Sequence, residues 1–275
     1  MNLILISVIT MGGLGALFAF ILSIANVKFK IEEDPKIEKI LEALPGANCG
    51  GCGYASCRNF AEEIAKGGAS VNACVVGGES VAQEIAKIMG VELKLTEKRV
   101  AFVHCKAHNG EKMKKAEYEG IKECGAADII LGADLACYYG CLGYGDCEDA
   151  CLFDAITMVD GLPEIDITKC TGCGNCMKAC PRNLISLEVL NKDVQYKIAC
   201  ASLDKGKRAR EVCLKSCIGC GICEKVCPFD ACHMKNGLPY IDERNCQACG
   251  VCAQKCPRNV IIEMGMNEWM GERVK

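Results

Sequence analysis

Cysteine is the residue type that could do chemistry in this chain, with 25 cysteines among 275 residues. Most of them stand in short, regular runs. Three runs share the pattern C-x2-C-x2-C-x3-C-P and begin at Cys170, Cys217 and Cys246. Thiolates at this spacing hold [4Fe–4S] clusters, because three cysteines of a run bind one cluster and the fourth binds another. The chemistry that these residues predict is one-electron transfer at iron–sulfur centres.

Zinc and disulfide bonds are the other uses of paired cysteines. An odd cysteine count in C-x2-C runs argues against a disulfide framework, and a reducing compartment favours metal ligation. Zinc ribbons also use C-x2-C pairs, but three repeats of the longer run are not ribbon spacing. We therefore favour iron–sulfur clusters, with zinc as the alternative because thiolates alone do not distinguish the two metals.

The sequence from Cys124 onward contains two copies of one unit, offset by 76 residues. The offset carries the tripeptide Pro-Arg-Asn from 181–183 to 257–259. The matched cysteines are Cys124 with Cys200, Cys137 with Cys213, Cys141 with Cys217, Cys147 with Cys223, Cys151 with Cys227, and Cys170, Cys173, Cys176 and Cys180 with Cys246, Cys249, Cys252 and Cys256. Each copy is typical of a bacterial two-cluster ferredoxin, with a strand, a turn at 160–161 or 236–237 and a second strand between its cysteine runs. So short a unit has little apolar core, and its clusters are expected to hold it together.

The crossed ligation of two-cluster ferredoxins assigns the cysteines of each copy to two sets. The predicted sets of the second copy are Cys217, Cys220, Cys223 and Cys256, and Cys227, Cys246, Cys249 and Cys252. The regular set of the first copy is Cys151, Cys170, Cys173 and Cys176. The other first-copy set is irregular, because Tyr144 stands where the offset predicts a cysteine. We assign to it Cys137, Cys141, Cys147 and Cys180. A [3Fe–4S] cluster or an unusual ligand is the alternative there.

A further cysteine motif precedes the two copies, within the stretch PGANCGGCGYASC and a more distant cysteine. Its members are Cys49, Cys52, Cys57 and Cys74. The glycines between them leave room for a cluster and let backbone amides turn toward its sulfurs. We predict one [4Fe–4S] cluster here, with zinc as the competitor. The sequence thus predicts five clusters, each with four cysteine ligands.

Five cysteines remain without an assignment: Cys105, Cys124, Cys200, Cys213 and Cys232. Cys232 matches an apolar position, Ile156, and is expected to be a buried hydrophobe. The other four could hold a sixth cluster, but buried free thiols are the preferred interpretation. Iron analysis near 24 per chain rather than about 20 would reverse that preference.

The first 27 residues contain no charged side chain, which exceeds the roughly 20 residues that a membrane helix needs. No Lys or Arg precedes Lys28, so we favour a retained anchor in the lipid over a cleaved signal peptide. Lys28 and Lys30 follow the span directly and predict that the rest of the chain lies on the cytoplasmic side.

Other function classes find little support. The net charge of −3 gives no basis for nucleic-acid binding, and no G-x-G-x-x-G follows a predicted strand, so no flavin or NAD site is expected. His104, His108 and His233 follow no metal or triad spacing and are expected at the surface or in local packing. The basic run at 205–210 is either a solvated loop or a docking patch for an acidic electron carrier.

The predicted fold class is α+β. An apolar helix comes first, then a small, mainly helical [4Fe–4S] domain, then two tandem bacterial-type ferredoxin modules. The predicted boundaries are 1–27 for the anchor, 28–44 for a linker or short helix, 45–95 for the four-cysteine domain, 96–134 for a connecting segment, 135–190 for the first module, 191–211 for a linker, 212–265 for the second module and 266–275 for a tail.

The order of these parts resembles the iron–sulfur subunit, designated B, of the Rnf complex. The resemblance rests on the uncharged N-terminal span, LPGANCGGCGYASC with the distant Cys74, CYYGCLGYGDC and the tandem ferredoxin modules, and it covers nearly the whole chain. The N-terminal motif alone is also similar to the iron–sulfur domain of corrinoid iron–sulfur proteins. The resemblance implies a subunit of a membrane-bound ferredoxin:NAD+ oxidoreductase that couples electron flow to Na+ or H+ translocation. It also implies reduced ferredoxin as the electron donor, NAD and flavins on other subunits, and Cys49, Cys52, Cys57 and Cys74 on the membrane-proximal cluster.

Two other function classes stay open at this point. One is a membrane-anchored polyferredoxin that serves a hydrogenase or another reductase, which co-purifying subunits would distinguish. The other is a structural zinc protein, which iron analysis of an anaerobic preparation would exclude.

Overall fold

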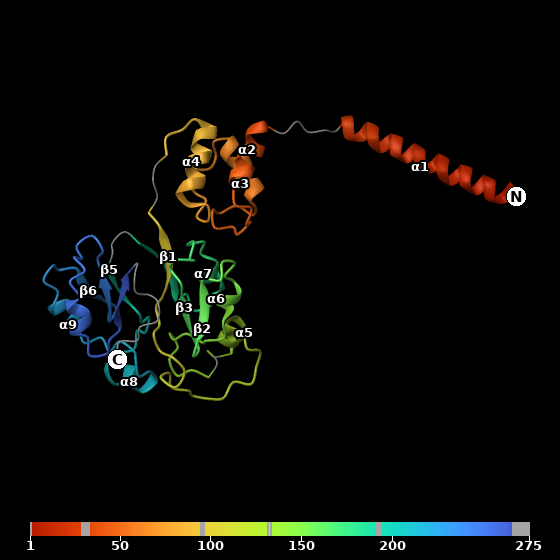
Figure 1. Cartoon of the computed structure of the whole chain (residues 1–275). Helices are drawn as coiled ribbons and strands as arrows, with labels where there is room; N and C mark the ends of the chain where they lie inside the picture. Colours follow the sequence, from red (N-terminus) through yellow and green to blue (C-terminus); the bar gives the residue numbers. More distant parts are fainter. Residues whose placement is uncertain are drawn as a thin grey trace.

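A computed structural model describes residues 2–28, 34–93, 97–130, 132, 134–190 and 194–265. Helix α1 (Asn2–Lys28) contains the span Ile6–Ala25, which has a mean hydropathy of 2.2 and is long and apolar enough to cross a membrane (Figure 1). The predicted anchor therefore forms a continuous helix. Lys30 and the predicted tail 266–275 lie outside the described residues.

A small helical unit follows, made of α2 (Pro35–Ala43), α3 (Cys57–Ala65) and α4 (Gly78–Met89). Each helix begins or ends at a residue that suits the position. Asp34 caps α2 by accepting from the Lys36 amide at 2.9 Å, and Ser56 caps α3 in the same way. Helix α4 ends at Met89 because the next residue, Gly90, adopts φ 70°. These helices pack around Ile40, Phe60 and Ile85.

Each ferredoxin copy contains the hairpin that its sequence predicts. Strand β2 (Ile156–Val159) pairs with β3 (Leu162–Ile165), and β6 (Cys232–Lys235) pairs with β7 (Leu238–Ile241). The turn residues Asp160 and Gly161 have φ of 46° and 71°, and Asn236 and Gly237 have 55° and 86°. Positive φ at both central residues defines the tight hairpin turn that Asp-Gly and Asn-Gly favour.

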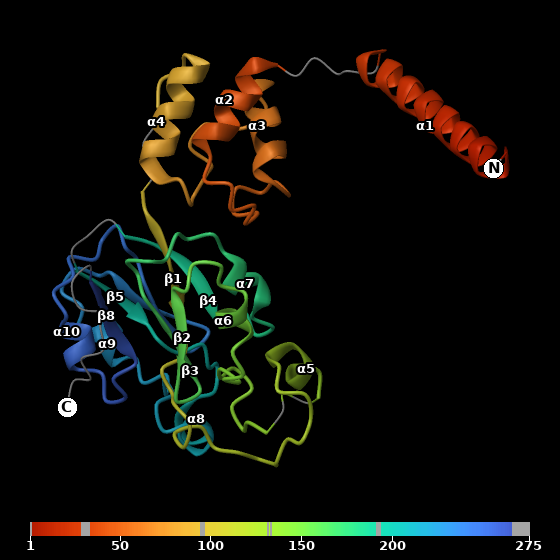
Figure 2. The same ribbon diagram turned by 45° about the vertical axis from the view of Figure 1, so that its right-hand side comes forward.

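Each copy also contains a second two-stranded sheet that the sequence analysis did not predict. Strand β1 (Arg99–Val103) pairs antiparallel with β4 (Ile185–Val189), and β5 (Val194–Ile198) pairs with β8 (Ile261–Gly265). The segment 96–134, predicted as a connection, therefore supplies one strand of the first copy. Figure 2 shows the two copies next to each other, and Phe102 of β1 packs with Met264 of β8 in one buried cluster.

The paired registers reveal an insertion in the first copy. Val103 of β1 faces Ile185 of β4, and Ile198 of β5 faces Ile261 of β8. Strand β1 therefore corresponds to β5 at an offset of 95 residues, whereas β4 corresponds to β8 at an offset of 76 residues. The first copy therefore holds 19 additional residues between these strands, in the region of α5 (Cys124–Ile129). In the fold the counterpart of Cys200 is consequently Cys105, rather than Cys124 as the constant sequence offset indicates.

Four short helices hold the cysteine runs in one common geometry. They are α6 (Asp146–Asp149), α7 (Asn175–Ala179), α9 (Ile222–Lys225) and α10 (Val251–Gln254). A glycine in the left-handed conformation precedes each, and the second residue of each helix is a cysteine. The glycine lets the chain turn sharply so that this cysteine faces inward. The remaining helix of the copies, α8 (Gly206–Val212), holds most of the basic run.

Candidate iron–sulfur sites

The N-terminal motif surrounds a cavity in the helical unit. Cys49, Cys52, Cys57 and Cys74 all line it, as the sequence predicts for one site. The Asn48 side chain accepts from the Cys57 amide at 2.8 Å, and the Gly77 amide donates to the Cys74 sulfur at 3.4 Å. The four predicted residues are thus brought together on one cavity.

The second copy contains two such cavities. One is lined by Cys217, Cys220, Cys223 and Cys256, and the other by Cys227, Cys246, Cys249 and Cys252. These groupings match the crossed sets that the spacing predicts. The Gly219 amide donates to the Cys217 sulfur at 3.5 Å, and the Ala231 amide to the Cys227 sulfur at 3.3 Å. Such N–H···S hydrogen bonds favour the thiolate form that an iron ligand requires.

The regular set of the first copy is also gathered in one place. Burial raises the pKa of Cys176 to about 12, and the nearby Cys170, Cys173 and Cys151 add to the rise. The Ala155 amide donates to the Cys151 sulfur at 3.4 Å, and the Ala101 amide to the Cys170 sulfur at 3.4 Å. The second of these bonds comes from β1, so the sheet that β1 forms with β4 helps to position this set.

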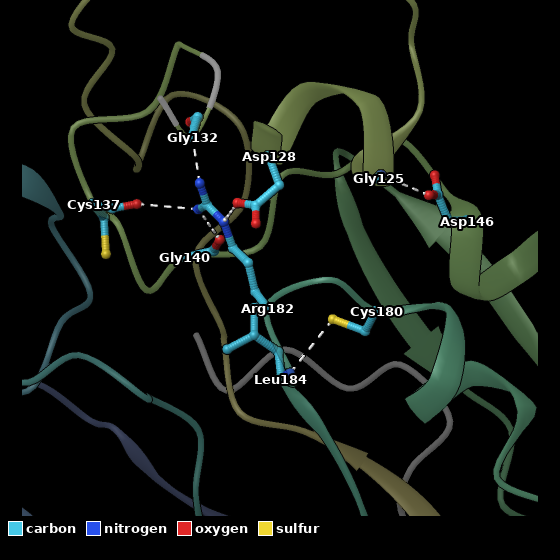
Figure 3. Close-up of polar contacts among 9 residues, drawn as sticks. All are labelled: Gly125, Asp128, Gly132, Cys137, Gly140, Asp146, Cys180, Arg182 and Leu184. Atoms are coloured by element: carbon cyan, nitrogen blue, oxygen red, sulfur yellow. Dashed lines mark hydrogen bonds and ion pairs between the residues drawn. The ribbon is translucent and has the colours of Figure 1, made fainter. Parts of the chain in front are cut away.

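The irregular first-copy set differs from the prediction at one position. The cavity there is lined by Cys124, Cys141, Cys147 and Cys180, and Cys137 is not among its lining residues. Asp146 holds the start of α5 against α6, since its carboxylate accepts from the Cys124 amide at 2.6 Å and from the Gly125 amide at 2.9 Å. Figure 3 shows the second of these hydrogen bonds. The insertion therefore brings Cys124 to the cavity beside which the offset predicts a cysteine at position 144.

Tyr144 stands where the offset predicts a cysteine, and it is not among the residues that line this cavity. Its ring packs 6.0 Å from the Tyr118 ring and 5.6 Å from the Lys122 ammonium, so it belongs to the inserted region's own small core. Burial raises the pKa of Cys147 to about 12, and Cys141 and Cys124 contribute in turn. The sequence carried half of this signal, the cysteine missing at position 144, whereas the constant offset matched Cys124 with Cys200.

Arg182 fixes the loop that carries Cys137. Its guanidinium pairs with Asp128 at 2.8 Å and donates to the carbonyls of Gly132, Gly140 and Cys137 (Figure 3). The sulfurs of Cys137 and Cys180 lie on either side of this arginine in Figure 3. Cys137 instead packs with Cys213, and the cavity set excludes it.

The same anchor recurs in the second copy. Arg258 donates to the carbonyls of Ser216 at 3.2 Å and Cys213 at 3.1 Å, and also to Leu214. The repeated tripeptide thus binds equivalent loops in both copies. Among the other unassigned residues, Cys232 is 2 % exposed and confirms the prediction of a buried hydrophobe. His104 contacts the Ile198 carbonyl at 2.9 Å and the Ser186 hydroxyl at 2.8 Å, in local packing as predicted.

The donor sets of these cavities suit an iron–sulfur cluster. At least four cysteines line each of the four cavities. A [4Fe–4S] cluster takes one thiolate on each of its four irons, so the donors present fit this group.

Comparison with protein families agrees with this fit. A family described as "Putative Fe-S cluster" matches residues 44–76. Two families described as "4Fe-4S dicluster domain" match residues 169–231 and 216–261. These features define an iron–sulfur electron carrier of mixed helix and strand content, and the apolar helix α1 is consistent with association with a membrane.

The chain belongs to the family of the subunit designated B in ion-translocating ferredoxin:NAD+ oxidoreductase, or Rnf, complexes. It is 45% identical over 243 residues to the subunit so designated in the Na+-translocating complex of Acetobacterium woodii, covering 88% of this chain and 72% of that one. It is 41% identical over 208 residues to its namesake in the ion-translocating complex of Methanosarcina acetivorans, covering 75% and 78%. It is 38% identical over 245 residues to its namesake in the proton-translocating complex of Clostridium ljungdahlii, covering 88% and 86%. The chain is therefore an iron–sulfur electron-transfer subunit of an ion-translocating oxidoreductase complex, as the resemblance implies.

Proposed function

We propose that this subunit takes electrons from a reduced ferredoxin at its second copy and passes them, through the N-terminal site, to membrane partners. A [4Fe–4S] cluster supplies one-electron oxidation and reduction when bound. Two electrons released by ferredoxin, with one proton, reduce one NAD+ to NADH on another subunit. The free energy of that transfer drives Na+ or H+ across the membrane.

Five cysteine sets would hold the clusters. They are Cys49, Cys52, Cys57 and Cys74; Cys151, Cys170, Cys173 and Cys176; Cys124, Cys141, Cys147 and Cys180; Cys217, Cys220, Cys223 and Cys256; and Cys227, Cys246, Cys249 and Cys252. The support is that each set lies together and that backbone amides donate to sulfurs in all five, the amide of Leu184 to Cys180 included. The sets keep four of the predicted groupings and replace Cys137 by Cys124.

One observation carries the direction of flow: the two copies differ in what covers equivalent cysteines. Cys249 and Cys220 of the second copy are exposed. Cys173, which matches Cys249 at the offset of 76, lies against Gly51 of the N-terminal unit, where an added Cβ would stand 3.1 Å from the Cys173 Cα. A soluble donor can thus approach the second copy, while the first copy adjoins the N-terminal site.

Helix α8 gives the exposed end a basic surface. Lys205, Lys207, Arg208 and Arg210 are all exposed. The Gly206 amide donates to the Ile218 carbonyl at 3.0 Å, which holds the helix against the loop between Cys217 and Cys220. The predicted solvated loop is therefore a helix beside an exposed cysteine, and its charge suits an acidic ferredoxin.

Charge reversal tests this proposal. In the intact complex, Lys207→Glu, Arg208→Glu and Arg210→Glu together should slow electron uptake from reduced ferredoxin by tenfold or more at low ionic strength and flatten its salt dependence, since steering governs association. The matched control reverses Lys36, Lys39 and Lys87, which are exposed on the N-terminal unit. Equal kinetics in the two triple variants would remove the docking proposal.

We further propose that α1 lies in the bilayer with the iron–sulfur units on the cytoplasmic side. Lys28 and Lys30 flank the apolar span, as expected for a cytoplasmic end, and a reducing compartment keeps 25 cysteines available for iron. Trypsin should cleave the units in sealed inverted vesicles and leave them intact in right-side-out vesicles. Protection in the inverted vesicles would reverse the orientation.

A further inference from the structure

Four buried or half-buried cysteines lie outside the five sets and gather where the two copies meet. They are Cys105, Cys137, Cys200 and Cys213. Each copy contributes two of them. Cys105 and Cys200 both follow the first strand of a copy by two residues, and Cys137 and Cys213 are matched at the offset of 76. The group is therefore arranged as two equivalent pairs.

Backbone contacts bring the pairs face to face. Cys105 and Cys200 form an isolated antiparallel bridge between the copies. Cys137 and Cys213 pack in one buried cluster, with Cys105 against it. An antiparallel contact between equivalent residues is what a two-fold axis produces, because each residue meets its own counterpart. The four thiols thus surround a local pseudo-two-fold axis between the copies.

The second-copy sulfurs of this group accept the same kind of hydrogen bond as sulfurs in the five sets. The Cys217 amide donates to the Cys200 sulfur at 3.3 Å, and the Lys215 amide donates to the Cys213 sulfur at 3.4 Å. A buried neutral thiol needs no such donor, whereas a thiolate bound to iron is stabilised by it.

We propose that Cys105, Cys137, Cys200 and Cys213 bind a sixth [4Fe–4S] cluster, shared by the two copies. The inference rests on the proposed iron–sulfur sets of the same chain, from which it takes the identity of the metal group. It revises the expectation that these cysteines are free thiols, and it gives Cys137 a different role from the one its sequence run indicates.

The position of this site gives it a role in the electron path. Cys217, a residue of the second-copy set, donates its amide to Cys200. On the other side, Cys141 of the first-copy set follows Cys137 by four residues, in a turn where the Gly140 amide donates to the Cys137 carbonyl at 3.3 Å. The shared site thus stands between one set of each copy. A cluster there would connect the two ferredoxin copies into one continuous chain of centres.

Iron counting tests the proposal on the full chain, purified anaerobically with its complex. Six clusters give about 24 iron atoms and about 24 sulfides per chain, and five give about 20. The double variant Cys137→Ser and Cys213→Ser should lose about four irons and one reduced-state EPR signal. The control Cys232→Ala removes a buried thiol that lines the cavity of the Cys227 set without being one of its four proposed ligands, and it should keep the wild-type count.

The outcomes separate this proposal from the proposed function. A wild-type count near 20, or an unchanged count in the double variant, would overturn the sixth site alone. A disulfide between two of these four cysteines in the wild type would overturn it as well. It would appear as two cysteines that resist thiol alkylation after the iron has been removed without a reductant. Because the wild-type count needs no variant to fold, it decides the matter even if the double variant is unstable. Zinc in place of iron would overturn both proposals. An iron content near 24 per chain in a complex that does not oxidise reduced ferredoxin would overturn only the proposed function.

Discussion

Gly51 of the N-terminal unit lies directly against Cys173 of the first ferredoxin copy, and an added Cβ would stand 3.1 Å from both the Cα and the Cβ of the cysteine. The same Cβ would stand 2.8 Å from a methyl group of Val75. Only a glycine allows two cysteine loops to approach this closely. The contact joins the N-terminal site to the nearest set of the first copy.

Larger side chains at position 51 should therefore separate two sites without removing either. We expect Gly51→Ala to slow internal electron transfer slightly and Gly51→Leu to slow it several-fold, with unchanged iron content. Stopped-flow absorbance of the complex after mixing with reduced ferredoxin measures this. Equal rates for glycine, alanine and leucine at position 51 would show that electrons do not cross this contact.

Cys124 should be essential to one cluster, and a cysteine introduced at position 144 should compensate for its loss. Cys124→Ser is expected to remove about four irons, because three thiolates remain at the site. Adding Tyr144→Cys to that variant restores the regular run and should recover the iron. If Cys124→Ser keeps the full iron content while Cys137→Ser removes the EPR signal of this set, the predicted ligand Cys137 is correct after all.

Lys197 should be a major stabilising residue between the copies. Its side chain is 9% exposed and its ammonium pairs with Glu188 of β4 and with Glu243. Lys197→Met leaves Glu188 without this cation. Removing one partner of a buried ion pair lowers the free energy of unfolding by about 3–5 kcal/mol. Lys207→Met, at a 91% exposed side chain, is the control and should change little. Urea unfolding of the two variants measures the difference, and similar midpoints would contradict the prediction.

The same ion pair predicts a pH dependence. Burial opposes ionisation of Glu188, but hydrogen bonds from Lys197 and Ser186 outweigh it and hold its pKa below the ordinary value. Its stabilisation is therefore present above the unfolded pKa of about 4.3 and is lost as pH falls through the lower folded pKa. In Lys197→Met, burial acts without this cation and raises the pKa of Glu188. The loss of stability relative to the wild type should therefore shrink as pH falls from 8 toward 5. Unfolding midpoints at several pH values test this, and a constant deficit would exclude Glu188 as its cause.

Arg182 should hold the shared site together without touching its sulfurs. Arg182→Met removes three carbonyl contacts and the pair with Asp128, so we expect loss of about four irons. Arg258→Met should have the same effect, because Arg258 holds the equivalent Cys213 loop. Iron analysis and EPR measure this outcome. If Arg182→Met instead removed the EPR signal of the set that contains Cys124, Arg182 would stabilise that set rather than the shared site.

Local features of this fold were predictable from its sequence. The hairpin turns at 160–161 and 236–237 follow from Asp-Gly and Asn-Gly, which need no distant partner. The groupings of the second-copy cysteines follow from spacing within short runs, and they agree with the cavities observed there. The apolar span of α1 follows from composition alone.

Non-local features were not predictable in the same way. Strand β1 pairs with β4, whose residues lie some 80 to 90 positions later, and short apolar stretches do not specify such a partner. The role of Cys124 was missed because a constant offset aligned it with Cys200. The 19-residue insertion breaks that offset, and only the strand registers reveal the counterpart, Cys105.

The antiparallel bridge between Cys105 and Cys200 has a consequence for how such a chain could arise. A single ferredoxin unit that carried cysteines at the positions of Cys200 and Cys213 would contribute two thiols to a symmetric homodimer. The two subunits together would then hold four thiols about the two-fold axis. Duplication within one gene makes that association intramolecular, so it no longer depends on protein concentration. Each half can then diverge, as the first copy has done by placing Cys124 of its insertion on the cavity lined by Cys141, Cys147 and Cys180.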